Sequence, residues 1–187
     1  MSPSDEKKAL RQRLIAERKS IGDAEKALLD AALCQEIASL AVFREADCVL
    51  GFLPIRGEPD LTPLLSMAST HGKQVALPRC EGGEMRFLPF SEKAACTPDQ
   101  FGILAPRGNT PEVRCTAKTL CLLPGLAATA DGKRLGYGGG FYDRFLRTFP
   151  GHTLFALYHS FLLQALPCEP FDLPVEIVIT EKGVILP

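Results

Sequence analysis

The residues best suited to chemistry lie between positions 134 and 144, where the chain reads Arg-Leu-Gly-Tyr-Gly-Gly-Gly-Phe-Tyr-Asp-Arg. Four glycines within five positions leave the backbone almost bare and free to adopt positive φ angles. Unpaired N–H groups in such a bend, followed by a helix, favour an anion such as phosphate. Arg134 could add a forked donor to phosphate oxygens, and Asp143 could bind the magnesium that accompanies a nucleotide. On these residues alone, a tight glycine turn before a helix is the simpler interpretation.

Two common nucleotide-binding motifs do not match this segment. The dinucleotide fingerprint requires a third glycine at the position that Phe141 occupies. A Walker-type phosphate loop requires four residues between its first glycine and its Gly-Lys pair, whereas six separate Gly125 from Gly132. Arg134 also stands where that loop has serine or threonine. Phosphate at this segment would therefore be held in another way.

Length and composition indicate one globular domain over residues 1–187. Hydrophobic residues make up 46% and charged residues 23%, the balance of an ordinary soluble protein. The net charge of −1 disfavours non-specific nucleic-acid binding, which requires a basic face. No apolar run approaches the ~20 residues of a membrane span, and the first residues lack the apolar core of a signal peptide. We therefore expect a cytoplasmic protein with no nucleic-acid or membrane partner.

The seven cysteines contain no C-x-x-C pair, which disfavours both a zinc site and a disulfide framework. We expect most of them to be buried free thiols. They are Cys34, Cys48, Cys80, Cys96, Cys115, Cys121 and Cys168.

Hydrophobic periodicity predicts helices over most of residues 5–41. In the first of them, Leu10 and Leu14 lie on one side. Lys7, Arg11 and Arg18 fall within roughly 40° of one another and form a basic stripe. Without other evidence, a solvated helix face is the simpler interpretation of this stripe.

From residue 47 onward, short β-like runs alternate with helices. Strands are predicted at 48–53, 74–78, 85–90, 119–123, 153–158 and 176–180, with a possible short edge at 184–186. Helices are predicted at 61–71 and at about 139–148, and the proline-interrupted residues 91–117 are predicted to be mostly irregular. This order indicates an α/β fold, with a mainly parallel or mixed sheet and helices on both faces, Rossmann-like without the dinucleotide fingerprint. Ligands of such sheets bind at the carboxyl ends of strands, where we expect the loop that begins at Pro124.

The glycine segment resembles the signature of the 5-formyltetrahydrofolate cyclo-ligase family, also called 5,10-methenyltetrahydrofolate synthetase. The resemblance covers Leu123-Pro-Gly-Leu126 and Asp131-Gly-x-Arg-Leu-Gly-Tyr-Gly-Gly-Gly-Phe-Tyr-Asp-Arg144. Weaker resemblances are Lys7-x-x-x-Arg11, Pro54-x-x-x-Glu58, Gly102-Ile103-x-x-Pro106, Leu166-Pro-x-x-Pro-x-Asp172 and Ile179-Thr-Glu181. The family usually has a glutamine shortly before the Leu-Pro of the C-terminal segment, and Tyr158-His-Ser-Phe-Leu162 lacks it. This departure concerns fine substrate contacts rather than the reaction class.

The resemblance implies ATP- and magnesium-dependent cyclisation of 5-formyltetrahydrofolate to 5,10-methenyltetrahydrofolate, with release of ADP and phosphate. An N-formyl group is an amide whose oxygen leaves poorly, and N10 of the folate is a weak nucleophile. Phosphorylation of the formyl oxygen would create a good leaving group, which N10 expels as it closes the ring. Such a site must align the formyl oxygen with the γ-phosphate and supply cations for the developing charge. The resemblance also favours a monomer.

The resemblance assigns Lys7, Arg11 and Arg134 to the ATP phosphates, and Asp143 and Asp172 to Mg²⁺. It extends ATP binding to Leu135, Gly136, Tyr137, Gly138, Gly139, Gly140, Phe141 and Tyr142. It assigns substrate binding to Leu53, Glu58, Met85, Tyr137, Gly138, Gly139, Gly140, Phe141 and Tyr142. Glu58 would accept hydrogen bonds from the pterin, since the amino-pyrimidine edge presents donors. Leu53, Met85 and Phe87 would form apolar walls, and Phe141 or Tyr142 could stack on a flat ring.

Several of these residues have simpler interpretations. Glu58 lies between Gly57 and Pro59 and could be an ordinary turn acid. Asp172, two residues after Pro170, could cap a turn. Met85 and Phe87 alternate as core residues would, and the three histidines share no catalytic or ligand spacing.

Two other functions remain open. An ATP-using paralogue could act on another N-formyl or amide substrate, with Glu58 facing a different ring. A non-catalytic folate- or RNA-binding relative is disfavoured, because the phosphate and magnesium candidates occur together and the net charge is near neutral.

Overall fold

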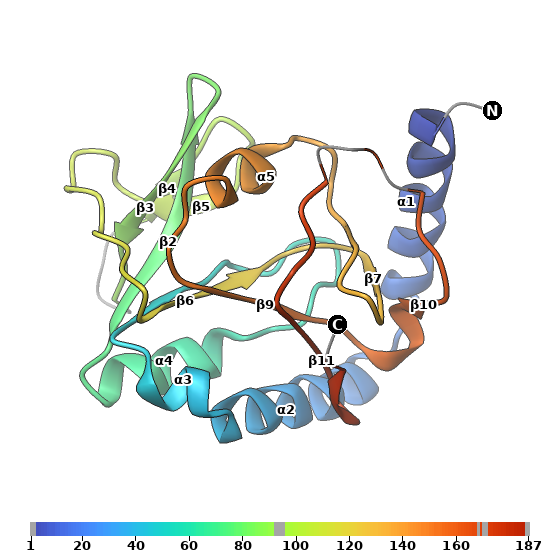
Figure 1. The fold of residues 1–187 in the computed structure, drawn as a ribbon, viewed down its shortest axis with the longest axis horizontal. Coiled ribbons are helices and arrows are strands. Elements are labelled where there is room, and N and C mark those ends of the chain that lie inside the picture. The colour runs from blue at the N-terminus through green and yellow to red at the C-terminus, as the bar shows by residue number, and fades with distance from the viewer. Residues whose placement is uncertain (1–2, 92–95, 168, 170–171, 186–187) are drawn as a thin grey trace.

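The computed structural model describes residues 3–91, 96–167, 169 and 172–185. Its centre is a seven-stranded sheet in the order β12-β11-β9-β6-β1-β2-β3 (Figure 1). These strands are β1 (Cys48–Leu50), β2 (Gln74–Glu81), β3 (Glu84–Pro89), β6 (Thr119–Leu123), β9 (His152–Ala156), β11 (Ile177–Thr180) and β12 (Gly183–Ile185). The five inner strands run parallel, and β3 and β12 pair antiparallel at the two edges. The predicted mixed, mainly parallel sheet is therefore confirmed.

The inner strands are buried because helices cover the sheet on both faces. Helices α2 (Asp23–Ser39), α3 (Ala41–Glu45) and α4 (Thr62–Thr70) lie together on one side, and α5 (Phe141–Leu146) lies on the other (Figure 1). All five residues of β6 are buried, as expected of a central parallel strand. Gly51 lets α4 approach closely, since an added Cβ would lie 2.6 Å from Leu65 Cδ1. The predicted α/β class is confirmed.

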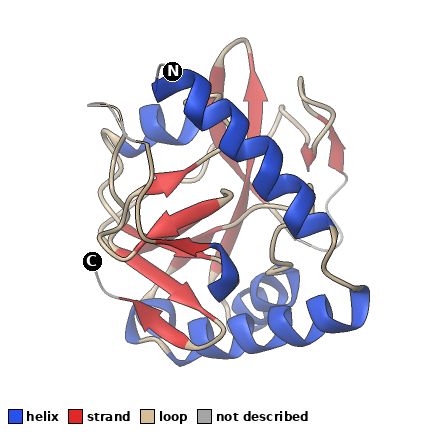
Figure 2. Cartoon of the chain, turned by 90° about the vertical axis from the view of Figure 1, so that its right-hand side faces the viewer, coloured by secondary structure: helices blue, strands red, loops and turns tan. Residues whose placement is uncertain are grey.

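Helix α1 (Pro3–Lys19) stands apart from the other long helix. Figure 2 shows it running diagonally across one side of the molecule. The simple interpretation of its basic stripe as a solvated face is wrong for two members, because Lys7 is 4% and Arg18 2% exposed. Both side chains are buried against later parts of the chain, and this packing fixes α1 beside the glycine segment.

The structure corrects several element predictions. The described part of residues 91–117 is mostly irregular, as predicted, but it also contains β4 (Cys96–Pro98) and β5 (Leu104–Pro106), which form an unpredicted two-stranded antiparallel ribbon. A second small sheet joins β7 (Ala127–Thr129), β8 (Arg134–Leu135) and β10 (Leu162–Leu163), with a short 3₁₀ helix (His159–Phe161) before β10. The predicted helix at 139–148 is only six residues long, so its dipole is small. Leu186 of the predicted edge lies outside the described residues.

The described cysteines are free thiols, but the prediction that most are buried is wrong, because among them only Cys48 and Cys121 are buried. Burial raises the pKa of the Cys48 thiol to about 11, which favours the unreactive neutral form. Cys168 lies outside the described residues.

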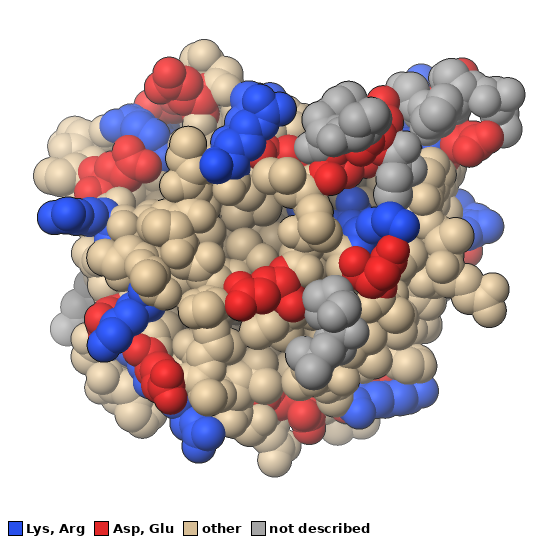
Figure 3. Space-filling model, viewed as in Figure 1, with Lys and Arg blue, Asp and Glu red and all other residues tan. Residues whose placement is uncertain are grey.

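The molecular surface carries both signs of charge. On the face shown in Figure 3, acidic and basic side chains are interspersed. Among the described residues, no helix is both long enough and apolar enough to span a membrane.

Candidate active site

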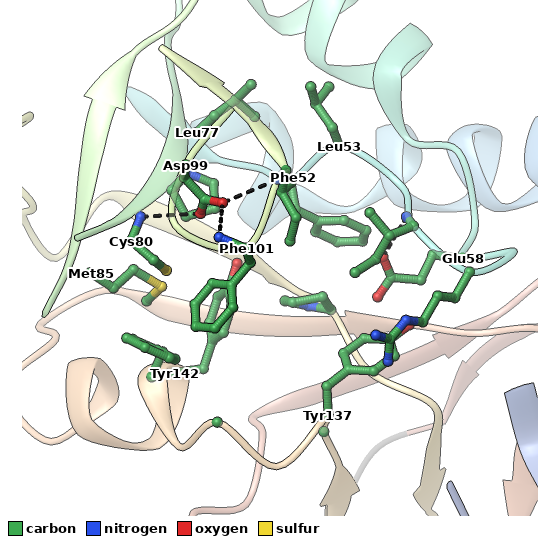
Figure 4. A pocket seen from close by; sticks show the side chains of 18 of the residues that line it. Phe52, Leu53, Glu58, Leu77, Cys80, Met85, Asp99, Phe101, Tyr137 and Tyr142 are labelled. Carbon is green, nitrogen blue, oxygen red and sulfur yellow. Dashed lines mark hydrogen bonds between the residues drawn. The ribbon is translucent and has the colours of Figure 1, made fainter. Parts of the chain in front are cut away.

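Two adjoining cavities share the glycine segment. The larger, of about 850 Å³, is bordered by the loop after β1, by β2 and β3, and by the β4–β5 ribbon (Figure 4). The smaller, of about 310 Å³, lies between α1, the glycine segment and the C-terminal segment. Residues lining both are Arg134, Gly136, Gly138, Gly140 and Asp143. This location, beside the loops that follow β1 and β6, is the predicted carboxyl end of the parallel strands.

Every residue that the sequence nominated for a site, apart from Phe87, lines at least one of these cavities. Besides the shared residues, the smaller cavity is lined by Lys7, Arg11, Leu135 and Asp172. The larger cavity is lined by Leu53, Glu58, Met85, Tyr137, Gly139, Phe141 and Tyr142. Segments more than 160 positions apart in the chain thus converge on one place, where Lys7 meets Asp172.

The glycines are required by both backbone conformation and close contact. Gly138 has φ 94° and Gly140 has φ 66°, a region that side chains with a Cβ rarely adopt. A Cβ on Gly138 would lie 3.2 Å from Arg11 Cζ, and one on Gly136 would lie 2.9 Å from Arg134 Nη1. The bare backbone therefore allows two guanidinium groups to approach the bend directly.

Arg134 links the two sides of the bend. Its Nη1 donates to the carbonyl oxygen of Pro124 at 2.9 Å, and its Nη2 donates to Asp143 Oδ1 at 3.2 Å. The side chain is only 4% exposed, and its buried Nε has no hydrogen-bond partner among the described residues. The guanidinium is thus held in a fixed orientation at the boundary of the two cavities.

The other cations of the smaller cavity are also hydrogen-bonded. Lys7 Nζ donates to Glu169 Oε2 at 2.7 Å and to Asp172 Oδ2 at 2.6 Å. Arg11 Nε donates to the carbonyl oxygen of Gly136 at 2.8 Å. Burial lowers the pKa of Lys7, but hydrogen bonds and Coulomb attraction from Asp172 and Glu169 outweigh it and raise the pKa. Lys7 therefore remains a cation.

The donor set suits Mg²⁺ only in company with a ligand. Asp143 and Asp172 line the same cavity, each bonded to a cation. Within the described parts of the chain, no three His, Cys, Asp or Glu side chains form a metal-binding group. Magnesium typically takes one or two carboxylates and completes its shell with phosphate oxygens and water. Asp143 and Asp172 would fit that habit if phosphate oxygens and water supplied the other ligands.

Glu58 is a buried carboxylate with spare hydrogen-bonding capacity. It is 1% exposed, and its Oε2 accepts the N–H of Ile55 at 3.0 Å. Its Oε1 has no hydrogen-bond partner in the described structure. Burial raises the pKa of Glu58 to about 7, although Tyr137, Arg18 and backbone N–H groups partly offset this rise. Glu58 thus bonds within its own turn, as the simpler interpretation has it, and also lines the larger cavity.

The rest of the larger cavity is mostly apolar. Figure 4 shows Glu58 and Tyr137 on one side, Met85 and Tyr142 on the other, and Phe101 between them. Phe101 is 57% exposed and packs edge-on against Phe141, with ring centroids 5.4 Å apart. Its loop is held by Asp99 Oδ1, which accepts the N–H groups of Phe101 and Ile103.

One predicted wall residue belongs to the core instead. Phe87 is completely buried and lines neither cavity, and its ring packs against Phe145, with centroids 4.9 Å apart, and against Tyr142, at 6.3 Å. Its alternation with Met85 in β3 is thus the ordinary in-and-out pattern of a strand.

Sequence reasoning missed Glu169, Phe101 and the burial of Arg18. Glu169 falls within the C-terminal segment that resembles the family, and this resemblance could have pointed to it. Pro170 of the same segment lies outside the described residues. Phe101 directly precedes Gly102 of the middle loop, which gave a weaker signal. Nothing in the helical periodicity distinguishes a buried arginine from a solvated one.

Comparisons with known proteins identify the family to which this chain is similar. The model of the 5-formyltetrahydrofolate cyclo-ligase family matches residues 3–181. The 5-formyltetrahydrofolate cyclo-ligase of Escherichia coli (strain K12) is 30% identical, over 74% of this chain and 80% of that protein. The enzyme of that name from Mycolicibacterium smegmatis is 28% identical, over 97% of this chain and 96% of its own.

A solved structure has the same fold. The NMR structure of Aquifex aeolicus 5,10-methenyltetrahydrofolate synthetase is 30% identical, with a TM-score of 0.83, and the match covers 96% of this chain and 92% of that one. The resemblance inferred from the glycine segment is confirmed. The chain belongs to the 5-formyltetrahydrofolate cyclo-ligase family.

Proposed function

We propose that this enzyme converts 5-formyltetrahydrofolate and ATP into 5,10-methenyltetrahydrofolate, ADP and phosphate. The observation that carries the proposal is the glycine segment, which lines both a mostly apolar cavity and a charged one. Two substrates placed in these cavities would meet at Arg134. Such an arrangement suits a reaction in which a phosphoryl group passes from one substrate to the other.

The chemistry requires little covalent participation by the protein. The formyl oxygen attacks the γ-phosphorus and ADP departs. N10 then attacks the formyl carbon and loses its proton, and the carbon–oxygen bond breaks to release phosphate. Positioning and charge stabilisation are the main contributions that a protein can make to phosphoryl transfer.

The smaller cavity supplies the cations for the phosphates. Lys7, Arg11 and Arg134 line it together, and the glycine backbone leaves room beside them. Asp143 and Asp172 would hold Mg²⁺, which when bound would neutralise charge on the phosphate oxygens. Because Arg134 is already fixed by Pro124 and Asp143, it needs little reorganisation to stabilise the transferring group.

The larger cavity supplies the folate site. The unpartnered Oε1 of Glu58 suits the donor edge of the pterin, since a buried acceptor gains most from a ligand that satisfies it. Leu53, Met85 and Tyr142 would contact the flat apolar parts of the substrate. From the family resemblance we further propose a monomeric enzyme whose partners are small molecules.

An absorbance assay tests this function. The purified protein is mixed with Mg-ATP and 5-formyltetrahydrofolate, and the near-ultraviolet band of the methenyl product is followed. We expect an increase that depends on ATP. No increase, together with ADP release on a different N-formyl compound, would support the paralogue instead.

A further inference from the structure

Arg18 is a buried cation whose position has no explanation in the phosphate site. It is 2% exposed and lines neither cavity. Among the described residues, none of the ion pairs includes it, since its bonding partners are neutral oxygens. An unpaired buried charge is costly unless its hydrogen bonds are well made. Such a residue is expected to be retained for what it holds in place.

The Arg18 guanidinium holds two parts of the larger cavity wall. Its Nη2 donates to the carbonyl oxygens of Gly125 and Leu126 at 2.8 and 2.9 Å. Its Nη1 lies 3.4 Å from the Tyr137 hydroxyl oxygen, to which it donates. It therefore ties the loop after β6 to the aromatic side chain that stands beside Glu58 (Figure 4).

The stem of Arg18 supports a third part, the loop that carries Glu58. Gly57 has φ 75°, and a Cβ there would lie 3.1 Å from Arg18 Cγ. The guanidinium also lies over the Phe161 ring, 5.2 Å from its centroid, which fixes its plane. The loop of Glu58 thus rests directly on the arginine side chain.

The positive charge also acts on Glu58. Arg18 lowers the pKa of this carboxyl, against the larger effect of burial that raises it. The other ionisable groups that interact with Glu58 are the hydroxyls of Tyr137 and Tyr142, and Arg56 acts in turn on Tyr137. Burial raises the pKa of both tyrosines, so they stay neutral. Among the described residues, Arg18 is thus a cation whose charge acts on Glu58.

We propose that Arg18 is a positioning residue of the folate site, which orients Glu58 and Tyr137 and supplies the buried positive charge that keeps the Glu58 carboxylate available as an acceptor. This role deepens the proposed function, because it rests on Glu58 as the acceptor for the pterin. It also connects α1 to both substrates, since Lys7 and Arg11 of the same helix line the phosphate cavity.

The first test measures the titration midpoint of Glu58 in the absence of any substrate. Protein labelled with ¹³C in its glutamate carboxyl groups is titrated by NMR, and the Glu58 signal is assigned by its loss in Glu58→Gln. In Arg18→Met, we expect the titration midpoint of Glu58 to rise above that of the wild type. In Arg18→Lys, which keeps the charge, we expect a smaller rise. The matched control is Arg13→Met, because Arg13 lies on the same helix with a 63% exposed side chain. An unchanged midpoint in folded Arg18→Met and in Arg18→Lys would overturn the proposal.

The second test separates the two substrates. We expect Arg18→Met to raise KM for 5-formyltetrahydrofolate about tenfold near pH 7, because a tenfold change is about the effect of losing one hydrogen bond to a charged group. The same substitution should change KM for ATP less than about twofold. The deficit should shrink as the pH rises towards 9, because a larger fraction of Glu58 then ionises. A deficit independent of pH, or equal for both substrates, contradicts the positioning role. Absence of wild-type turnover contradicts the proposed function instead, and the NMR titration still decides the effect of Arg18 on Glu58.

Discussion

At the scale of single residues, the candidate site contains polar groups that are buried and therefore cannot form hydrogen bonds with water. Glu58 and Arg134 are almost fully buried, and each keeps one polar atom without a partner among the described residues. Unsatisfied buried groups are rare in folded proteins, since each costs about 1–3 kcal/mol. Both atoms belong to residues at the cavity walls, where a ligand could satisfy them. Function and stability are therefore expected to oppose each other at these positions.

Replacing Glu58 tests that opposition. The pKa of Glu58 is raised from 4.5 to about 7, so its ionisation destabilises the fold progressively between those pH values. Glu58→Gln removes this cost, and we expect it to be more stable than the wild type at pH 8 by on the order of 3 kcal/mol. The difference should vanish below about pH 4.5, where the wild-type carboxyl is protonated in both states. Thermal unfolding at both pH values measures it.

The same substitution should impair folate binding more than ATP binding. The amide keeps the acceptor oxygen for Ile55 but loses the charge that faces the pterin donors. Separate KM values for the two substrates show the effect, and an equal rise in both would contradict the assignment of Glu58.

Replacing Arg134 tests the phosphate site. We expect Arg134→Ala to lower kcat by about 100-fold or more, because it removes a fixed donor to the transferring group. Folding should remain intact, as judged by circular dichroism. Arg134→Lys keeps the charge but lacks the forked donors of arginine, so we expect its kcat to lie between those of the wild type and of Arg134→Ala. Unchanged kinetics in Arg134→Ala would remove this residue from the site.

At the scale of elements, the glycine segment and α1 make one unit. Arg11 bonds to Gly136, and its guanidinium fills the space beside Gly138. The short α5 contributes little dipole, so in the proposed function side-chain cations and the bare bend would provide the attraction for the phosphates. Helix α1, the element furthest from the glycine segment along the sequence, thus completes the site that the glycines form.

A methyl group at the bend tests this unit. Gly138→Ala forces a positive φ on alanine and crowds Arg11, so we expect ATP binding to weaken at least tenfold and stability to fall by about 1 kcal/mol. Gly72→Ala is the matched control, because Gly72 has φ 79° with no atom near its added Cβ. The control should lose similar stability and keep its ATP affinity. Equal ATP affinity in both variants would exclude the bend from nucleotide binding.

Two neighbouring lysines test the role of α1. Lys7 is buried between Glu169 and Asp172, whereas Lys8 is exposed. We expect Lys7→Ala to raise KM for ATP about tenfold and Lys8→Ala to leave it unchanged. Steady-state kinetics at fixed ionic strength compares them, and similar values for both variants would contradict the predicted contact of Lys7 with phosphate.

At the scale of the whole molecule, the sequence predicted what depends on local pattern. Strand β6 could be predicted because a buried strand is a continuous run of apolar residues. The bare bend could be predicted because it requires glycines. The β4–β5 ribbon was missed, since its strands are only three residues long and end at Pro98 and Pro106, and since Arg79 of β2 bonds to it from outside the segment. Periodicity gave the basic stripe of α1 but not its partners, which lie more than 100 positions away for Lys7 and Arg18.

The central claim of the proposed function is that a phosphoryl group is transferred from ATP in one cavity to the formyl oxygen of the substrate in the other. The direct measurement uses 5-formyltetrahydrofolate labelled with ¹⁸O in its formyl group and follows the label by mass spectrometry after turnover with Mg-ATP. We predict that the ¹⁸O appears in the released phosphate, because the formyl oxygen becomes a phosphate oxygen before N10 expels it. Unlabelled phosphate, formed while the methenyl product accumulates, would contradict the account.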